Sequence, residues 1–305
     1  MTTHSGGWGA AAFALICLSA AGARAAPPPS DTTVQGVTVE SAPARQAERV
    51  VLERRVGAFV RTMTAQSYDE ALTLWRDPVC PLVAGMAREQ AEFILARLSQ
   101  IASEAGAPLA PQKCRANLYI VASANADRLV RAWHAHDDGI FGHGRPYAVR
   151  RFIETPRPVR IWRNADLNSP DGVALAGGSM DIGNNEYGGL PATHFADDTR
   201  LSWNAVRNVS SAIVVVDVDR MAGINFGQLT DYIGMIGLTD VDTDLDVGDA
   251  PSILKLFAPT APGAARPAGL SDWDRAYLKA LYHTSQKLKL QSADIASNMV
   301  HDLLP

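Results

Sequence analysis

Apolar side chains recur at helical spacing in the first half of this chain, and the pattern is clearest between residues 91 and 105. One stripe there consists of Ala91, Ile94, Leu95, Leu98, Ile101, Ala102 and Ala105. This spacing predicts an amphipathic helix. Gly106 and Pro108 follow and predict its end, because glycine closes helices and proline cannot continue them. An earlier stripe predicts a helix from Ala44 to Met63.

Further helices are predicted from capping residues and from apolar spacing. Ser67 and Ser271 each stand three residues before an acidic residue, the pattern of a capping box. The capping box at Ser67 predicts a short helix that reaches residue 75. The capping box at Ser271 predicts a helix that continues through residue 281. Apolar spacing predicts helices over about 125–136 and 224–238, and a last helix near the end of the chain.

Three segments are typical of strands. Apolar side chains alternate or cluster in two of them, at residues 117–122 and 157–163. The third, Ala212–Val216, is a continuous apolar run that ends at Asp217. Such a run suits a central strand covered on both faces. The order of elements predicts an α+β fold with a small mixed sheet, flanking helices and a helical C-terminal half. Residues 164–200 are rich in Gly and Asn and predict a long loop or hairpin.

The first residues resemble an export signal. Residues 10–22 are apolar, too short to span a bilayer, and lead to Ala23-Arg24-Ala25, a small-residue cleavage site. We therefore expect a signal peptide at 1–25, a flexible leader at 26–43 and a single α+β domain at 44–305. A buried or membrane-anchoring helix is the alternative for the first segment. The mature protein is expected in the periplasm or outside the cell, with no membrane insertion after cleavage.

Cysteine content agrees with export. If Cys17 leaves with the signal peptide, Cys80 and Cys114 remain. An even count in an exported chain predicts a disulfide, with two free buried thiols as the alternative.

Composition and charge exclude one class of function. The 305 residues are 47% hydrophobic and 20% charged, with 28 Lys and Arg against 32 Asp and Glu, a net charge of −4. The chain can therefore build a real core. The acidic balance disfavours nucleic-acid binding, which needs a basic face.

Segment 210–282 resembles the core of zincin-type metalloproteases. Residues 230–238, Thr-Asp-Tyr-Ile-Gly-Met-Ile-Gly-Leu, lie on the frame of the His-Glu-x-x-His helix, and residues 270–282 resemble a later zincin segment that ends in Leu-Tyr. Most of the mature chain also resembles exported Gram-negative proteins of unknown function, which share the paired cysteines and an Arg-x-Trp strand like Arg160-Ile161-Trp162. These resemblances imply a zincin-like fold.

The departures from the zincin pattern decide the expected chemistry. Thr230 and Gly234 stand at the two histidine positions, and neither supplies a zinc ligand. Asp231 stands at the glutamate position. The resemblance therefore implies a pseudoenzyme, with no catalytic residue, metal ligand or cofactor assigned. Asp217, Asp231 and Tyr232 are the candidate residues of a remaining cleft.

Two other clusters suggest metals only weakly. His134, His136 and His143 with Asp137 are dense, but positions i and i+2 of a helix do not share a face. The acidic loop 240–249 lacks the glycine and glutamate that a calcium-binding EF-hand loop requires.

The leading hypothesis is a soluble, non-catalytic envelope protein that binds an unknown peptide or protein partner. The first alternative is a hydrolase that uses Asp217 and Asp231 as acid and base, which requires both side chains in one pocket. The second alternative is a calcium-dependent adhesion or assembly module that uses the acidic loop.

Overall fold

The computed structural model describes residues 42–65, 71–142, 146–169, 206–259, 265–285 and 290–304. Residues from Ala42 to Pro305 form one compact unit. The predicted signal peptide 1–25 lies outside the described residues, and so does the predicted leader up to residue 41. Residues 42 and 43, placed in that leader by the sequence, belong to the first helix.

Helices and strands alternate through the first two thirds of the described chain. The helices are α1 (Ala42–Met63), α2 (Arg88–Ala105), α3 (Ala126–His136), α4 (Pro146–Glu154), α5 (Phe226–Leu238), α6 (Asp272–His283) and α7 (Gln291–Leu303). The strands are β1 (Thr73–Leu74), β2 (Pro81–Ala84), β3 (Leu118–Ser123), β4 (Val159–Asn168) and β5 (Val206–Asp217). Short 3-10 turns are η2 (Asp138–Phe141), η4 (Val218–Arg220) and η5 (Ile253–Phe257). After β5 the described chain is helical only, as predicted.

The sheet is mixed, with β5 at its centre. β3 pairs with the C-terminal half of β5 in parallel, from Leu118 opposite Ala212 to Ser123 opposite Asp217, and β1 pairs in parallel with its start. β4 runs antiparallel along the other side of β5, and β2 pairs in parallel with β3. The predicted α+β class with a mixed sheet is thus confirmed at this level.

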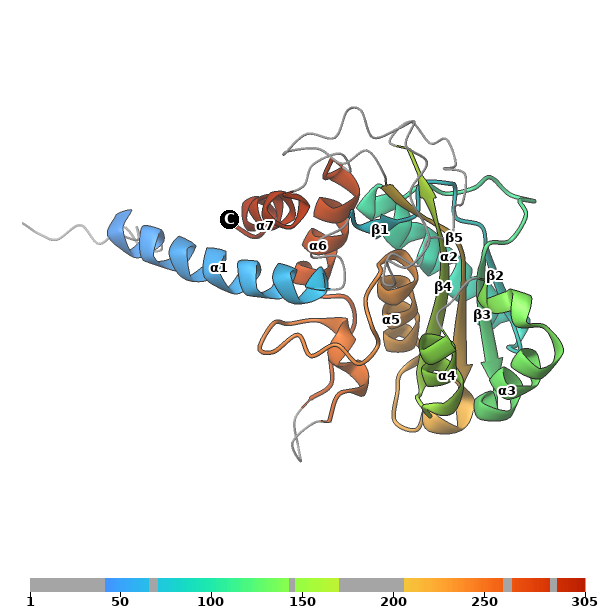
Figure 1. Ribbon diagram of the computed structural model, residues 1–305. Helices are drawn as coiled ribbons and strands as arrows, with labels where there is room; N and C mark the ends of the chain where they lie inside the picture. The colour runs from blue at the N-terminus through green and yellow to red at the C-terminus, as the bar shows by residue number, and fades with distance from the viewer. Residues whose placement is uncertain are drawn as a thin grey trace, which may run out of the picture. The chain divides into compact units, whose positions relative to one another are not determined.

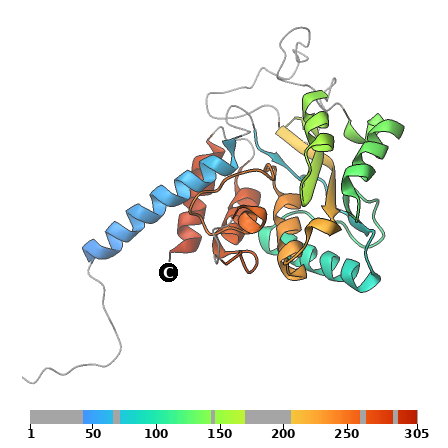
Figure 2. The ribbon, with the colours of Figure 1, turned by 90° about the horizontal axis from the view of Figure 1, so that it is seen from below.

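The two faces of the sheet are covered by different helices (Figures 1 and 2). Val214 and Val216 of β5 join the main core, to which α2 and α5 contribute. Val215 points to the other face, where it packs with α3 and α4 in a smaller core. Alternation along β5 therefore explains why its apolar run is continuous: both faces of the strand are buried.

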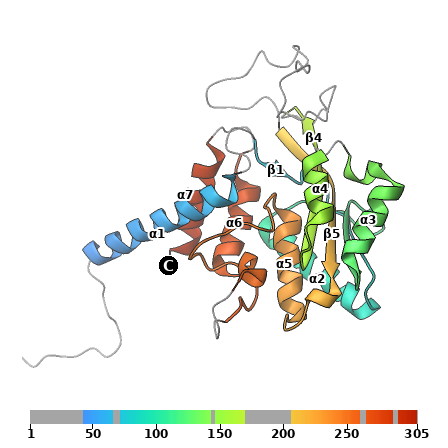
Figure 3. The same cartoon turned by 60° about the horizontal axis from the view of Figure 1, so that its bottom comes forward.

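Helices α1, α6 and α7 extend the main core beyond the sheet (Figure 3). Phe59 of α1 packs edge-on against Trp273 and Tyr277 of α6, with ring centroids 5.7 Å apart in both pairs. Within the described residues no helix combines the length and the apolar character needed to cross a membrane.

Several local predictions were wrong. Residues 73–74 form strand β1 instead of the end of a helix, and residues 66–70 lie outside the described chain. Residues 164–168, expected in the loop, continue β4, because they pair with the first half of β5. The remainder of the predicted 164–200 loop, from residue 170, is not described. Strand β2 and helix α4 were not predicted.

The predicted disulfide is present. Cys80 and Cys114 are bonded, with their Cα atoms 6.0 Å apart. The bond joins the residue before β2 to the segment before β3 and closes a loop with a sequence separation of 34. In the chain-entropy description a loop of this length stabilises the fold by about 3–4 kcal/mol.

The buried carboxylate of Asp274 fixes the start of α6. It accepts hydrogen bonds from Ser252 Oγ (2.6 Å) and from the backbone N–H groups of Ile253 (2.8 Å) and Ser271 (2.9 Å). The predicted capping box is thus confirmed, and its acidic residue also holds η5. Burial raises the pKa of Asp274 above its ordinary value, although these hydrogen bonds oppose the shift.

The substitution Asp274→Asn is expected to lower the free energy of unfolding by about 2–4 kcal/mol, because an amide leaves buried donors unpaired. A raised folded-state pKa means that the carboxylate becomes less favourable as the pH rises above about 4, the unfolded value. The stability difference between wild type and variant should therefore shrink as the pH rises above this unfolded value. Urea unfolding followed by tryptophan fluorescence measures it, with the exposed Glu89→Gln as control. If the stability difference between wild type and Asp274→Asn grew with pH, the raised pKa of the buried Asp274 would be contradicted.

Candidate functional site

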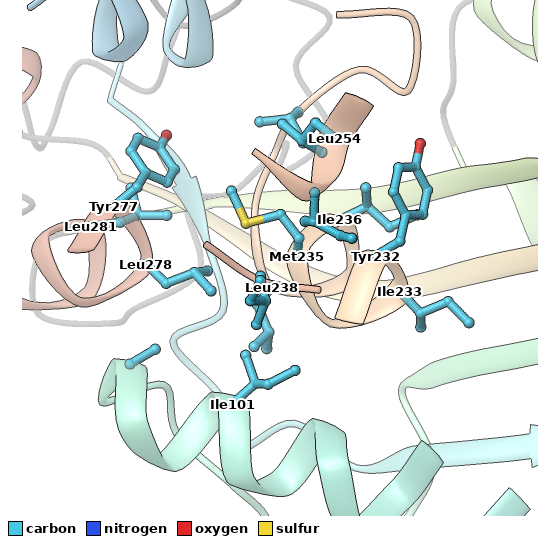
Figure 4. Close-up of a cluster of buried hydrophobic side chains, with 14 of the residues drawn as sticks. Ile101, Tyr232, Ile233, Met235, Ile236, Leu238, Leu254, Tyr277, Leu278 and Leu281 are labelled. Atoms are coloured by element: carbon cyan, nitrogen blue, oxygen red, sulfur yellow. The ribbon is translucent and has the colours of Figure 1, made fainter. Parts of the chain in front are cut away.

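Helix α5, which carries the zincin-like frame, is buried on all sides. It begins after Asn225, whose side chain accepts from the N–H of Gly227 (2.7 Å), while Gln228 accepts from the N–H of Asn225 (2.8 Å). Every residue from Leu229 to Leu238 is buried. Figure 4 shows α5 side chains with Ile101 of α2 on one side and Leu278 and Leu281 of α6 on another. No face of α5 is therefore left open for a catalytic group.

The two positions that match zincin histidines are used for packing. Thr230 is fully buried, and its Oγ1 donates to the carbonyl of Phe226 (2.9 Å). A Cβ on Gly234 would lie 2.6 Å from Cδ1 of Ile101, so this glycine allows α2 and α5 to approach closely. Neither residue offers a zinc donor, and at position 234 even a Cβ would meet Ile101. The residues at these positions do not fit a zinc ion.

Asp231, at the position of the zincin glutamate, forms a buried ion pair. Its carboxylate accepts from Arg97 Nε (2.6 Å) and Nη2 (3.1 Å) and from the N–H of Leu270 (2.8 Å). A Cβ on Gly269 would lie 2.6 Å from Asp231 Oδ2, so the chain before α6 approaches as closely as glycine permits. Asp231 therefore joins α5, α2 and the start of α6, and its oxygens are engaged.

Tyr232 is a core residue rather than a cleft residue. Its ring packs edge-on against Phe257 with centroids 4.9 Å apart, and only 1% of the residue is exposed. Burial raises the pKa of Tyr232 well above its ordinary value, so the phenol is neutral at physiological pH.

Asp217 lies where ligands often bind in α/β folds. β3 continues into α3 on one face of the sheet, whereas β5 continues into α5 on the other, so the C-terminal ends of these neighbouring strands form a topological switch point. Asp217 pairs there with Arg220, and Arg220 Nη2 lies 3.0 Å from Asp127 Oδ2 of α3. Asp127 also contacts Arg160, which is 1% exposed.

This cluster contains two acids and two arginines joined by ion pairs. The guanidinium of Arg160 is buried, and its nitrogens have no hydrogen-bond partner of good geometry among the described residues. Burial lowers the pKa of Arg160. Sequence reasoning identified Asp217 but not its partner Arg220, three positions on, nor Asp127 and Arg160, which lie on other elements far along the chain.

The structure does not bring Asp217 and Asp231 together. Asp217 contacts groups on the α3 side of the sheet, whereas Asp231 contacts α2 on the opposite side. Each carboxylate has its own arginine. The shared pocket that an acid–base hydrolase requires is therefore not formed by these two side chains.

Basic side chains pair with three of the five aspartates of the acidic loop 240–249. Arg151 of α4 lies 3.0 Å from Asp242 and 2.8 Å from Asp244, and Arg157 also pairs with Asp244. Arg163 Nη1 lies 3.8 Å from Asp240. The loop thus attaches to α4 and β4 through ion pairs.

No group of three possible ligands for a metal ion occurs in the part of the chain that the structure describes. His134 and His136 lie exposed at the end of α3, and His143 is not described.

A groove of about 370 Å³ lies between α2, α6 and α7, and we call it the α2–α6–α7 groove. Its floor is apolar and is formed by Ile101, Ala105, Leu270, Ala276, Leu278 and Leu303. Its rim is charged and is formed by Glu104, Asp272, Arg275, Lys279 and Asp302. Two floor residues connect it to α5: Ile101 contacts Gly234, and the N–H of Leu270 binds Asp231. Sequence reasoning missed this groove because its residues come from three separate helices.

Comparison of this chain with protein-family models, curated proteins and solved structures gave no match.

The Arg97–Asp231 pair should contribute far more to stability than an exposed pair. A double-mutant cycle with Arg97→Met and Asp231→Asn is expected to give a coupling energy of about 1–3 kcal/mol, because the side chains are only 22% and 9% exposed. The same cycle on Arg49 and Glu53, which are 55% and 46% exposed, should give about 0.3–0.5 kcal/mol. Equal coupling in the two cycles would refute a special role for Asp231.

Two glycines of α5 should respond differently to alanine. Gly237→Ala is expected to stabilise the protein by up to about 1 kcal/mol, because a Cβ there meets Leu118 at an ordinary 3.6 Å and alanine favours the helix. Gly234→Ala should instead destabilise it by about 1–2 kcal/mol, since Ile101 must move. Thermal unfolding of both variants measures this contrast, and the reverse order would show that α2 and α5 are not in close contact.

Proposed function

We propose that this chain is an exported, non-catalytic protein of the bacterial envelope that binds a peptide segment of a partner. In this proposal the scaffold is zincin-like without metal ligands, and the α2–α6–α7 groove receives the peptide. One observation carries the proposal: the α5 positions expected to hold metal and base instead support the walls of this groove, through Gly234 against Ile101 and through Asp231 bound to Leu270.

The character of the groove supports binding rather than chemistry. An apolar floor with a polar rim is the usual arrangement of a docking site for side chains. The rim holds carboxylates, a guanidinium and an ammonium but no histidine, cysteine or serine. Its lining therefore offers no Ser–His or Cys–His pair of the kind that activates a hydrolase nucleophile.

Two observations support the envelope location. The Cys80–Cys114 disulfide is characteristic of proteins in oxidising compartments. The segment at 1–25 has the pattern of a signal peptide. The alternatives gain no comparable support, because Asp217 and Asp231 lie apart and because arginines neutralise Asp242 and Asp244 of the acidic loop.

Mature protein purified from the periplasm without chelator is expected to contain no stoichiometric zinc and to bind apolar decapeptides without cleaving them. Metal analysis, fluorescence anisotropy and mass spectrometry of the recovered peptides measure these three properties. Hydrogen exchange should slow in α2, α6 and α7 when a peptide is bound.

Two leucines near the ends of α7 provide a matched pair of variants. Leu303→Gln places an amide in the groove floor and should weaken peptide binding about tenfold, whereas Leu290→Gln, on an exposed residue outside the groove, should leave it unchanged. Stoichiometric zinc, or peptide cleavage that a chelator abolishes, would overturn the proposed function.

A further inference from the structure

The rim of the α2–α6–α7 groove has an unbalanced charge. Arg275 Nη1 lies 2.8 Å from Glu104 Oε2 of α2, and Lys279 Nζ lies 2.8 Å from Asp302 Oδ2 of α7. These two ion pairs connect α6 to the helices on either side. Both cations of the rim are thus neutralised by acids that also belong to the rim.

Asp272 is the remaining charged group of the rim. It lies exposed in the first turn of α6 and has no ion-pair partner among the described residues. Its position at a helix N-terminus favours the negative charge. One end of the groove therefore presents a carboxylate beside an apolar floor.

Small side chains create the space beside this carboxylate. Ala105 of α2 and Ala276 of α6 both line the floor, and both are buried. Larger residues at these two positions would fill the gap between the helices. The groove can therefore accept an apolar side chain of a ligand while a neighbouring group of that ligand reaches the rim.

We propose that the partner segment carries a Lys or Arg next to apolar residues, and that Asp272 receives this cation. This inference rests on the proposed function, since it specifies the ligand of the same groove. An acidic segment would meet Asp272 with nothing to neutralise it, because Arg275 and Lys279 are engaged. Charge complementarity therefore selects a basic apolar peptide over an acidic one.

The test uses two fluorescein-labelled decapeptides that share the same Leu, Ala and Ser residues and differ only in one central Lys or Glu. Fluorescence anisotropy gives a Kd for each peptide with the full mature chain at low ionic strength. The Lys peptide is expected to bind about threefold to tenfold more tightly, the size of one or two exposed charge interactions. Added salt should reduce this ratio, because exposed charges are screened.

Two variants test whether Asp272 causes the preference for the Lys peptide over the Glu peptide. Asp272→Asn should bring the ratio of the two Kd values near one, and Asp272→Lys should invert it. The control is Glu89→Lys, which reverses an exposed charge in the first turn of α2 outside the groove and should leave the ratio unchanged. Thermal unfolding of each variant verifies that it is folded.

The outcomes separate this inference from the proposed function. If both peptides bind equally, or if the ratio is the same in all variants, the charge preference is wrong while binding to the groove stands. If neither peptide binds and no segment of α2, α6 or α7 is protected from exchange, the proposed function fails as well. A ratio that Glu89→Lys changes as much as Asp272→Lys would assign the effect to net charge and overturn the role of Asp272.

Discussion

The ion pair between Asp231 and Arg97 is the contact on which the arrangement of the helices depends. One carboxylate on α5 binds a guanidinium from α2 and a backbone N–H just before α6, so it fixes three segments that are distant in the sequence. Burying a charge is unfavourable unless it is paired and hydrogen-bonded, and here both conditions hold. Gly234 and Gly269 lie beside this contact, and a side chain at either position would push the helices or the preceding loop away. The α2–α6–α7 groove exists because its walls are held in this position.

The same principle explains why the carboxylates that attract attention in the sequence are each paired with an arginine. Asp217 pairs with Arg220, Asp231 with Arg97, and Asp242 and Asp244 with Arg151. These acids connect elements of the fold: η4 to β5, α5 to α2, and the acidic loop to α4. The high proportion of arginine among the basic residues suits this use, because its planar head binds a carboxylate through two nitrogens.

The sequence predicted those elements that are marked by residues close to one another along the chain. α2 and α6 were predicted because an apolar stripe, a terminal glycine and a capping box lie within a few residues of each other. β3 and β5 were predicted from short apolar runs, and the disulfide from the even number of cysteines in an exported chain. β1 and β2 were missed because strands of two and four residues exist only through their pairing with β5 and β3. The partner of Asp231 was missed for a related reason: Arg97 lies 134 positions from Asp231, and nothing near either residue indicates the other. Arg220 lies only three positions from Asp217 and was also missed, because an acid and an arginine at that spacing do not by themselves indicate a pair.

In the function we propose, recognition arises in a groove on a scaffold whose other carboxylates are used for structure. Ala105 and Ala276 look like ordinary helix formers in the sequence, and only the packing of α2 against α6 makes them the floor of one gap. The ion pairs across the rim are exposed, so each contributes little to stability, but together they leave one acid of the rim without an ion-pair partner among the described residues. Affinity in such a groove must come from burying apolar side chains, because the hydrophobic contribution to the free energy of binding grows with the apolar area removed from water. In this proposal Asp272 discriminates by charge among ligands of similar shape. An exposed charge changes the relative affinities of different partners more than it raises the affinity for any one of them.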